Sequence, residues 1–270
     1  MNTAPNTAHP DLLVEREGAV VTWVLNRPAE RNALSMGMRE GMLEALRDIE
    51  RDPSMRVLVI RGAGSDFCAG GDVKALAAGD ANTPQARLSR MRALHPLITG
   101  LAQLDRPVLA AVDGVAFGAG FGLALLADLL LVSTGARLCM AFQRVGLVPD
   151  FGATYTLPRA VGLQRARELV LSAREVGGPE AVQLGLALEC VEPQLLHARV
   201  REIAMALAKA SPVSMGLAKR ALNASLGNDL ATMLEMESSA QAIAATSDDA
   251  RSAFEAFARK EPLAFRWPAK

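Results

Sequence analysis

Two glycine-rich turns concentrate backbone N–H groups that could bind a negatively charged oxygen. The first contains Gly70 and Gly71 and follows the apolar run VLVIRG at 57–62. The second contains Gly118 and Ala119 and also lies between an apolar run and a helix-like stretch. Glycine permits backbone geometries that direct amides into a cleft, and N–H groups at a helix start carry the positive end of its dipole. The two turns together predict one shared anion site.

Two other interpretations of these turns are open. Each could be a tight turn before a helix, with Asp72 as the cap in the first case. The glycines at 118, 120 and 122 also suggest a dinucleotide-binding turn. That motif needs a third glycine one residue later and an acidic residue roughly 20 positions on, at a strand end. Here the next apolar run ends in Ser133-Thr134-Gly135, so the sequence disfavours a dinucleotide site.

Apolar runs alternate with helix-like segments up to about residue 194, which predicts an α/β core. The runs at 11–16 and 19–25 flank Glu17-Gly18 and predict a hairpin. Buried strands are expected at 57–62, 108–112 and 129–133. Ser35 is a candidate cap for a helix that reaches Ile49, and further helices are expected over 84–104 and 118–127.

The C-terminal part of the sequence reads as helices alone, over 195–209, 212–226, 229–245 and 248–259. We therefore expect a disordered N-terminus over 1–10, an α/β core over 11–194 and a helical region over 195–270. The Ala, Met and Leu residues of that region suggest a subunit interface. Packing onto the chain's own core is an equally open interpretation.

The composition excludes several classes of protein. Twenty-nine basic residues balance 29 acidic ones, which gives no electrostatic support for binding nucleic acid or an anionic membrane. The longest apolar stretch, 123–132, contains Asp128 and is shorter than the roughly 20 residues that span a bilayer. Three cysteines without a CxxC pair or His cluster predict reduced thiols and no metal site. The polar N-terminus has no signal-peptide features, so we expect a cytoplasmic protein.

Several motifs occur in the order found in the crotonase superfamily of enoyl-CoA hydratases and isomerases, which the sequence resembles from about residue 11 to 262. They are NRP at 26–28, NAL at 32–34, FCAGGD at 67–72, VDG at 112–114, GAG at 118–120, GLVPD at 146–150, LPR at 157–159 and FARKEP at 257–262. The resemblance implies a spiral of ββα units with a C-terminal helical trimerisation region. It also implies an acyl-CoA thioester as substrate, no cofactor beyond the coenzyme A of that substrate, and a homotrimer or a dimer of trimers.

The same resemblance implies roles for individual residues. It places the thioester oxygen between the amides of Gly71 and Ala119, and Ala69 against the adenine. Arg27 and Lys260 become candidates for binding the coenzyme A phosphates, and Lys260 could do so in a neighbouring subunit. Ordinary solvated charges are the alternative interpretation for both side chains.

The two glutamates with which the family's hydratases add water map onto Gly122 and Phe142. Neither residue can activate a water molecule, so hydration by two carboxylates is disfavoured. Asp150 lies in the loop whose family counterparts face the acyl chain. It is therefore the candidate acid/base that moves a proton between two carbons, and a purely structural Pro-Asp turn is the alternative.

The stretch around Asp150 is especially similar to the phenylacetate-catabolism isomerases of this family. We therefore predict an enoyl-CoA isomerase, with an atypical enoyl-CoA hydratase or a catalytically silent coenzyme A-binding protein as alternatives. Asp113 and Asp128 read as structural residues, at a turn and between a helix and a strand. His95 and Tyr155 are left open as either pocket or surface side chains.

Overall fold

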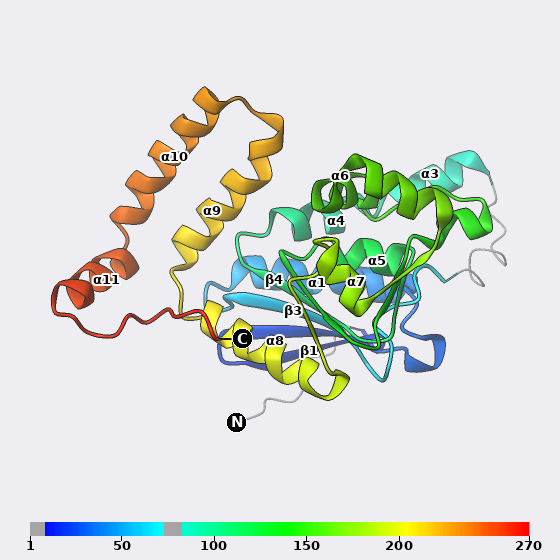
Figure 1. Cartoon of the computed structure of the whole chain (residues 1–270), viewed down its shortest axis with the longest axis horizontal. Coiled ribbons are helices and arrows are strands. Elements are labelled where there is room, and N and C mark those ends of the chain that lie inside the picture. The colour runs from blue at the N-terminus through cyan, green and yellow to red at the C-terminus, as the bar shows by residue number, and fades with distance from the viewer. Residues whose placement is uncertain (1–8, 73–82, 270) are drawn as a thin grey trace.

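Two β-sheets form the centre of the molecule in a computed structural model that describes residues 9–72 and 83–269 (Figure 1). Among these residues, the larger sheet has the strand order β1-β2-β3-β4-β6-β9 and the smaller one the order β5-β7-β8. The larger sheet is parallel apart from the antiparallel β1–β2 hairpin. The strands are β1 Leu12–Glu17, β2 Val20–Leu25, β3 Val57–Gly62, β4 Val108–Val112, β5 Val115–Phe117, β6 Leu129–Ser133, β7 Arg137–Cys139, β8 Glu175–Gly177 and β9 Glu189–Val191.

The helices connect these strands and extend beyond them at the C-terminal end. The α-helices are α1 Met36–Arg51, α3 Pro84–Arg92, α4 His95–Gln103, α5 Ala119–Ala124, α6 Ala153–Ser172, α7 Gly178–Gln183, α8 Pro193–Leu207, α9 Pro212–Ala224, α10 Leu230–Ala245 and α11 Asp248–Ala258. Short 3-10 helices are η1 Pro28–Glu30, η2 Ala141–Val145 and η3 Ser225–Gly227. α6 is interrupted at Gly162, whose φ of 74° and ψ of 160° are not helical.

The larger sheet is buried on both faces, which explains why its strands are continuous apolar runs. Successive side chains of β3 point to opposite faces. Val57 and Val59 belong to an apolar cluster with α8, whereas Leu58 and Ile60 belong to the main cluster, which also contains residues of α1, α4 and α5. The strands predicted at 57–62, 108–112 and 129–133 are confirmed as β3, β4 and β6.

The register between β2 and β3 determines which loops become neighbours. The two strands pair in parallel from Val20 opposite Val57 to Leu25 opposite Gly62, so both end at the same level. The segment after β2 and the glycine turn after β3 therefore leave the same edge of the sheet together. Ser35 caps α1 as predicted, because its side chain accepts a hydrogen bond from the Met38 N–H at 3.0 Å.

The single helix predicted over 84–104 is wrong, because the structure has α3 and α4 with a break at Ala93 and Leu94. Pro96 explains the break. Its ring has no N–H and would clash with the carbonyl of Arg92 in a continuous helix, whereas it fits the first turn of a new one. The helix predicted over 118–127 is also shorter, since α5 ends at Ala124.

The helical region predicted from residue 195 divides into two parts. α8 packs against the larger sheet through Leu196, Val200 and Ile203 and so belongs to the core. α9, α10 and α11 instead extend to one side of the sheets (Figure 1). No residue of α10 or α11 is buried in the chain. The helix predicted after Asp72 and most of the N-terminus predicted to be disordered lie outside the described residues.

Two structural features are absent from residues 9–72 and 83–269. None of the helices there has both the length and the apolar character that crossing a membrane requires. No three His, Cys, Asp or Glu side chains in these ranges are grouped so that they could hold a metal ion.

Candidate active site

Asn32 holds the first glycine turn against the segment that follows β2. Its side chain is fully buried and donates to the carbonyl oxygens of Ala63 at 2.9 Å and Asp66 at 2.7 Å. Its Oδ1 accepts from the Arg27 N–H at 2.9 Å. Its φ of 57° is left-handed, a conformation that asparagine tolerates better than most residues. The sequence indicates Asn32 only as part of a motif, and this bracing role was not predicted.

Backbone hydrogen bonds extend the contact from Asn32 to the turn itself. The Leu34 N–H donates to the Gly70 carbonyl at 2.8 Å, and Leu34 forms a β-bridge with Gly71. The Ala69 N–H donates to the Arg31 carbonyl at 2.8 Å. The start of α1 is therefore placed beside the first glycine turn.

The two glycine turns are in direct contact with each other. Cys68 forms a β-bridge with Ala116, and the Phe117 N–H donates to the Cys68 carbonyl at 3.0 Å. A Cβ atom at Gly70 would lie 2.7 Å from the Phe117 oxygen and 3.5 Å from the Ala119 nitrogen. Only glycine fits there, and its absent side chain lets the turns approach. The structure thus brings together the two turns that the sequence suggested would share one site.

Ala119 is the first residue of α5, so its N–H belongs to the helical turn that has no intrahelical acceptor. The residue before it, Gly118, has φ 51° and ψ −121° and donates its N–H to the Cys139 carbonyl at 2.9 Å. Among residues 9–72 and 83–269, the N–H groups of Ala119 and Gly71 donate to no backbone carbonyl of a turn, loop or helix cap. N–H groups without a backbone acceptor are the kind of donor that an oxyanion site requires.

The backbone of Asp150 lies against Gly122 of α5, one of the two positions that correspond to hydratase glutamates. A Cβ atom at Gly122 would be 2.8 Å from the Phe151 Cβ and 3.2 Å from the Asp150 carbonyl oxygen. The second hydratase position, Phe142, is buried and places its ring 3.7 Å from where a Cβ of Gly118 would be. Both hydratase positions are therefore occupied by packing that leaves no carboxylate to hold water.

The turn at Asp150 is stabilised by its backbone carbonyl, and one carboxylate oxygen of its side chain makes no hydrogen bond in that turn. Its Oδ1 atom is buried and has no hydrogen-bond partner among the residues described, while its backbone carbonyl accepts from the Ala153 N–H at 3.0 Å. Burial raises the pKa of this carboxyl group, and the charge of Arg39 and a backbone N–H of its own residue oppose that increase. A carboxyl group in such an environment is suited to accept and return a proton.

Arg39 is a residue near this site that was not predicted from the sequence. It lies one turn inside α1 and is half-buried, and its Nε is buried without a hydrogen-bond partner among the residues described. The signal was present in the spacing, since Arg39 precedes the buried Met42 by three residues and the buried Leu46 by seven. An arginine on the apolar stripe of a helix is unusual enough to be considered as a site residue.

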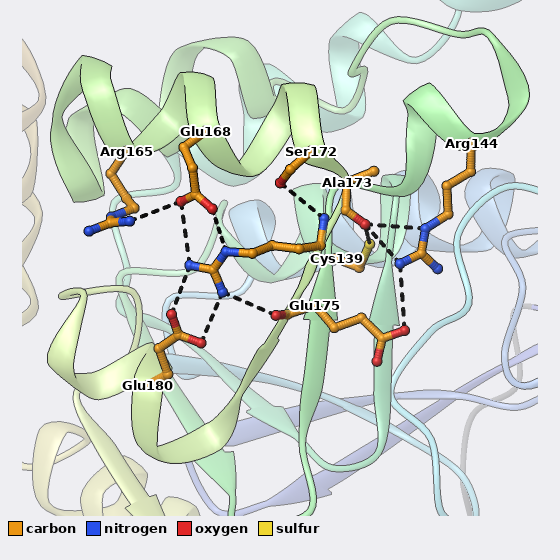
Figure 2. A network of polar contacts seen from close by, with 9 residues as sticks. Cys139, Arg144, Arg165, Glu168, Ser172, Ala173, Glu175 and Glu180 are labelled. Atoms are coloured by element: carbon orange, nitrogen blue, oxygen red, sulfur yellow. Dashed lines mark hydrogen bonds and ion pairs between the residues drawn. The ribbon is translucent and has the colours of Figure 1, made fainter.

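Polar contacts link η2, which precedes the Asp150 loop, to the residues that follow α6 (Figure 2). Before the loop, Arg144 of η2 donates to the Ala173 carbonyl from Nη2 at 2.8 Å and from Nε at 3.2 Å. Its guanidinium also lies 3.6 Å from the Glu175 carboxylate. After α6, Arg174 forms ion pairs with Glu168 and Glu180. The Arg144 contacts therefore join η2 to the residues after α6, and the Arg174 ion pairs join the end of α6 to α7.

The candidate coenzyme A-binding residues lie in different places. Ala69 is half-buried in the first glycine turn. The Arg27 side chain lies beside that turn, where it donates to Asp72 at 3.2 Å and to the Ala33 carbonyl at 2.9 Å. It is therefore a paired and mostly buried charge in this structure. Lys260 is exposed beyond α11, and Figure 1 shows α11 far from α5 of the same chain.

Four other side chains considered from the sequence have clear positions. His95 and Tyr155 are exposed, and the Arg159 guanidinium lies 3.3 Å from the centre of the Tyr155 ring. Asp128 accepts from the Val108 N–H at 2.8 Å and from Lys219 of α9 at 2.7 Å, which confirms it as a structural partner. Asp113 accepts from the Gly114 N–H at 2.9 Å, as a turn residue would.

Comparison with known proteins identifies relatives over nearly the whole chain. The family described as "Enoyl-CoA hydratase/isomerase" matches residues 15–268. The 1,2-epoxyphenylacetyl-CoA isomerase of Escherichia coli is 36% identical over 94% of this chain and 97% of its own. A probable enoyl-CoA hydratase of Rhodobacter capsulatus is 36% identical over 92% and 93%. A solved enoyl-CoA hydratase/isomerase structure from Cupriavidus metallidurans has a TM-score of 0.92 and 41% identity, covering 99% of both chains.

Proposed function

Because the chain belongs to the enoyl-CoA hydratase/isomerase family, we propose that it is an isomerase that shifts a double bond in an enoyl-CoA thioester. The crotonase fold expected from the sequence is confirmed by the structural similarity. One observation carries the choice of isomerase over hydratase. Asp150 presents a buried oxygen without a partner among the described residues, and Gly122 and Phe142 leave no carboxylate at the hydratase positions.

The proposed reaction begins with the thioester carbonyl oxygen accepting hydrogen bonds from the Gly71 and Ala119 amides. These donors are fixed by the contact between their turns, so they stabilise the enolate without reorganisation. Asp150 removes a proton from a carbon beside the double bond, which leaves the enolate and a neutral carboxyl group. The same group returns the proton two carbons along, and the double bond moves without net gain or loss of atoms.

The substrate is proposed to be a coenzyme A thioester of a ring-derived acyl group. Two similarities support this narrower proposal: the sequence around Asp150, and the overall similarity to an epoxyphenylacetyl-CoA isomerase. Ala69 is proposed to contact the adenine, with Arg27 and Lys260 near the phosphates. Arg27 would have to keep or exchange its pairing with Asp72 in doing so. Lys260 would act on a neighbouring subunit, because α11 lies far from its own α5 (Figure 1).

Hydration of an enoyl-CoA is the second candidate reaction, and the similarity to a relative described as a probable enoyl-CoA hydratase supports it. In that reaction Asp150 would hold and activate the water that adds to a 2-enoyl-CoA. Loss of the absorbance of the conjugated thioester on mixing with crotonyl-CoA would support hydration. A silent coenzyme A-binding protein would produce neither that change nor exchange of substrate protons with solvent.

The deciding experiment is the Asp150→Asn variant assayed on 3-enoyl-CoA and ring-derived acyl-CoA thioesters. Removal of the base should lower isomerisation by at least the roughly 10²- to 10⁴-fold that positioned proton transfer contributes. Deuterium uptake at the substrate α-carbon, followed by NMR, should fall in parallel, while acyl-CoA affinity stays close to that of the wild type. Asp48→Asn, on the exposed side of α1, is the control and should retain full activity. Near-full activity of Asp150→Asn on every accepted substrate would disprove the proposal.

A further inference from the structure

Arg39 is placed near the reaction centre by the hydrogen bonds that position α1. Ser35 caps the helix, and the preceding Leu34 forms a β-bridge with Gly71 of the first glycine turn. Arg39 lies in the first turn of α1, where its N–H donates to the carbonyl of the cap residue Ser35 at 3.3 Å. The side chain therefore starts one helical turn from the residue that pairs with the proposed oxyanion turn.

The guanidinium of Arg39 and the carboxylate of Asp150 are two desolvated charges of opposite sign. Arg39 Nε and Asp150 Oδ1 are both buried, and neither has a hydrogen-bond partner among the residues described. The guanidinium makes a weak contact with a neighbour on its own helix, with Nη1 3.9 Å from the Met36 sulfur. Desolvated charges are costly unless compensated, so each charge depends on the field of the other.

The other charged groups near Arg39 do not replace Asp150 as its counterpart. Asp72 lies within electrostatic range of Arg39 but also forms an ion pair with Arg27. Burial raises the pKa of the nearby Cys68 thiol to about 12, so this group is neutral near pH 7. Arg90 of α3 is a like charge that opposes Arg39. α5 contributes Gly122 beside the Asp150 loop and so adds no charge there.

Arg39 and Asp150 interact electrostatically, without a hydrogen bond between Arg39 Nε and Asp150 Oδ1, and each charge affects the pKa of the other group. Burial raises the pKa of Asp150, and the positive charge of Arg39 acts in the opposite direction. Burial lowers the pKa of Arg39, and the negative charge of Asp150 opposes that decrease. A guanidinium remains protonated at all pH values of interest. Its charge is therefore constant while Asp150 changes protonation state.

We infer that Arg39 is a positioning residue for proton transfer, whose fixed positive charge favours the ionised form of Asp150 that accepts the substrate proton. The inference rests on the proposed role of Asp150. In the proposed step the substrate carbon loses a proton to the Asp150 carboxylate, and Arg39 keeps all of its protons. Without the charge of Arg39, only the backbone N–H of Asp150 would oppose the effect of burial, so the equilibrium would shift toward the protonated carboxyl group, which cannot act as a base.

The test is the pH dependence of kcat/KM for isomerisation by Arg39→Met and Arg39→Lys. The acid limb of this profile reports ionisation of the essential base in the free enzyme. Removing a positive charge should raise the pKa of Asp150, so the acid limb of Arg39→Met should move to higher pH. Its activity should be lost mainly on the acidic side and recovered at higher pH. Arg39→Lys retains the charge and should keep the acid limb near its wild-type position.

Arg47→Met is the matched control. Arg47 is exposed and lies on the same helix, ~12 Å further along its axis by the helical rise. The substitution removes the same charge as Arg39→Met does. This variant should leave the profile unchanged. If Arg39→Met does not fold, Arg39→Gln provides a polar neutral replacement, and circular dichroism verifies the fold of each variant.

The outcomes separate this inference from the proposed function. An acid limb at the wild-type pH in Arg39→Met or Arg39→Gln would overturn the inference. Equal loss in Arg39→Met and Arg39→Lys across all pH values would also overturn it, because it indicates a structural role. Failure of the proposed function has a different signature, namely full activity of Asp150→Asn. The inference is supported when Asp150→Asn is inactive and the acid limb moves only in the neutral Arg39 variants.

Discussion

At the scale of single residues, the proposed site depends on a glycine, whose lack of a side chain lets the two turns touch. Gly70 has a φ of 100°, and the space where its Cβ would stand is occupied by the backbone of Phe117. At this position the two turns therefore meet through main-chain atoms. Because backbone atoms cannot move aside as a flexible side chain can, the separation of the Gly71 and Ala119 amides is set by residue 70.

Gly70→Ala should therefore damage catalysis more than folding. The new Cβ would force the turns apart and misplace an oxyanion donor, and loss of one donor typically lowers kcat by about 10²- to 10³-fold. The measurement is kcat for isomerisation together with urea unfolding. Gly18→Ala is the control, because Gly18 also has a positive φ of 59° but no atom lies within 4 Å of the place its Cβ would take. Similar kcat values in the two variants would show that the turn contact does not set the amide geometry.

The residues that could be predicted from the sequence differ physically from those that could not. The two glycine turns could be recognised because strand–turn–helix patterns are local, and the family resemblance then singled out the Gly71 and Ala119 amides. The proposed partnership of Arg39 with Asp150 joins residues more than a hundred positions apart, and no local pattern indicates that they influence each other. Asn32 was recognised as part of a motif, but its three hydrogen bonds depend on the parallel register of β2 and β3.

At the scale of elements, the position of Asp150 depends on a clamp between η2 and the end of α6. Ala173 has a φ of 47°, and its carbonyl accepts from Arg144 and, at 3.1 Å, from the Cys139 thiol (Figure 2). The Asp150 loop follows η2 directly, and α6 separates it from Ala173. Restraint of η2 is expected to limit how far the carboxylate can move relative to α5, which carries the Ala119 amide.

Arg144→Ala should loosen this loop without unfolding the protein. Each lost hydrogen bond should cost about 0.5–1.5 kcal/mol, toward the lower end for a half-exposed side chain. Amide hydrogen exchange should increase over 146–152, and kcat should fall. Arg165→Ala in α6 is the control, since its side chain is 47% exposed against 45% for Arg144 but pairs with the neighbouring Glu168 of its own helix. Equal exchange rates over 146–152 in both variants would argue against the clamp.

The elements show why some boundaries could be predicted and others could not. Buried parallel strands are continuous apolar runs, so β3, β4 and β6 were found at their observed bounds. The division of α3 from α4 was missed although Pro96 gives a local reason for it. The assignment of α8 to the sheet could not be read from its sequence, because an apolar stripe does not specify which surface it covers.

At the scale of the whole molecule, the C-terminal helices expose an unusual amount of apolar surface. α9 is held to the core by polar contacts, with Lys219 bound to Asp128 and Arg220 to Asp105. Beyond these contacts the large exposed apolar side chains are Leu222, Leu226, Leu230, Leu234, Ile243, Phe254, Phe257, Leu263, Phe265 and Trp267. Extensive exposed apolar surface of this kind marks an interaction site. Of the two interpretations left open by the sequence, the structure favours a subunit interface over packing on the chain's own core.

We therefore expect the protein to form a trimer, or a hexamer of two trimers, through α9–α11 and the C-terminal segment. Light scattering after size exclusion should give a mass three or six times the 28.6 kDa of one chain. Leu222→Glu combined with Phe257→Glu should shift the mass toward that of the monomer, because a buried charge in the interface is unfavourable. Leu171→Glu is the matched control, since Leu171 of α6 is 71% exposed against 72% for Leu222.

The same experiment relates assembly to the site. If Lys260 binds coenzyme A phosphates in a neighbouring subunit, dissociation should weaken acyl-CoA binding while leaving the fold of each chain intact. Isothermal titration with an acyl-CoA at matched protein concentrations measures this directly, and Lys260→Met in the intact assembly should reproduce part of the loss. A wild-type mass of one chain would contradict the expected interface. An unchanged affinity in the dissociated variant would instead remove Lys260 from the site and leave coenzyme A recognition to residues around Ala69 of the same chain.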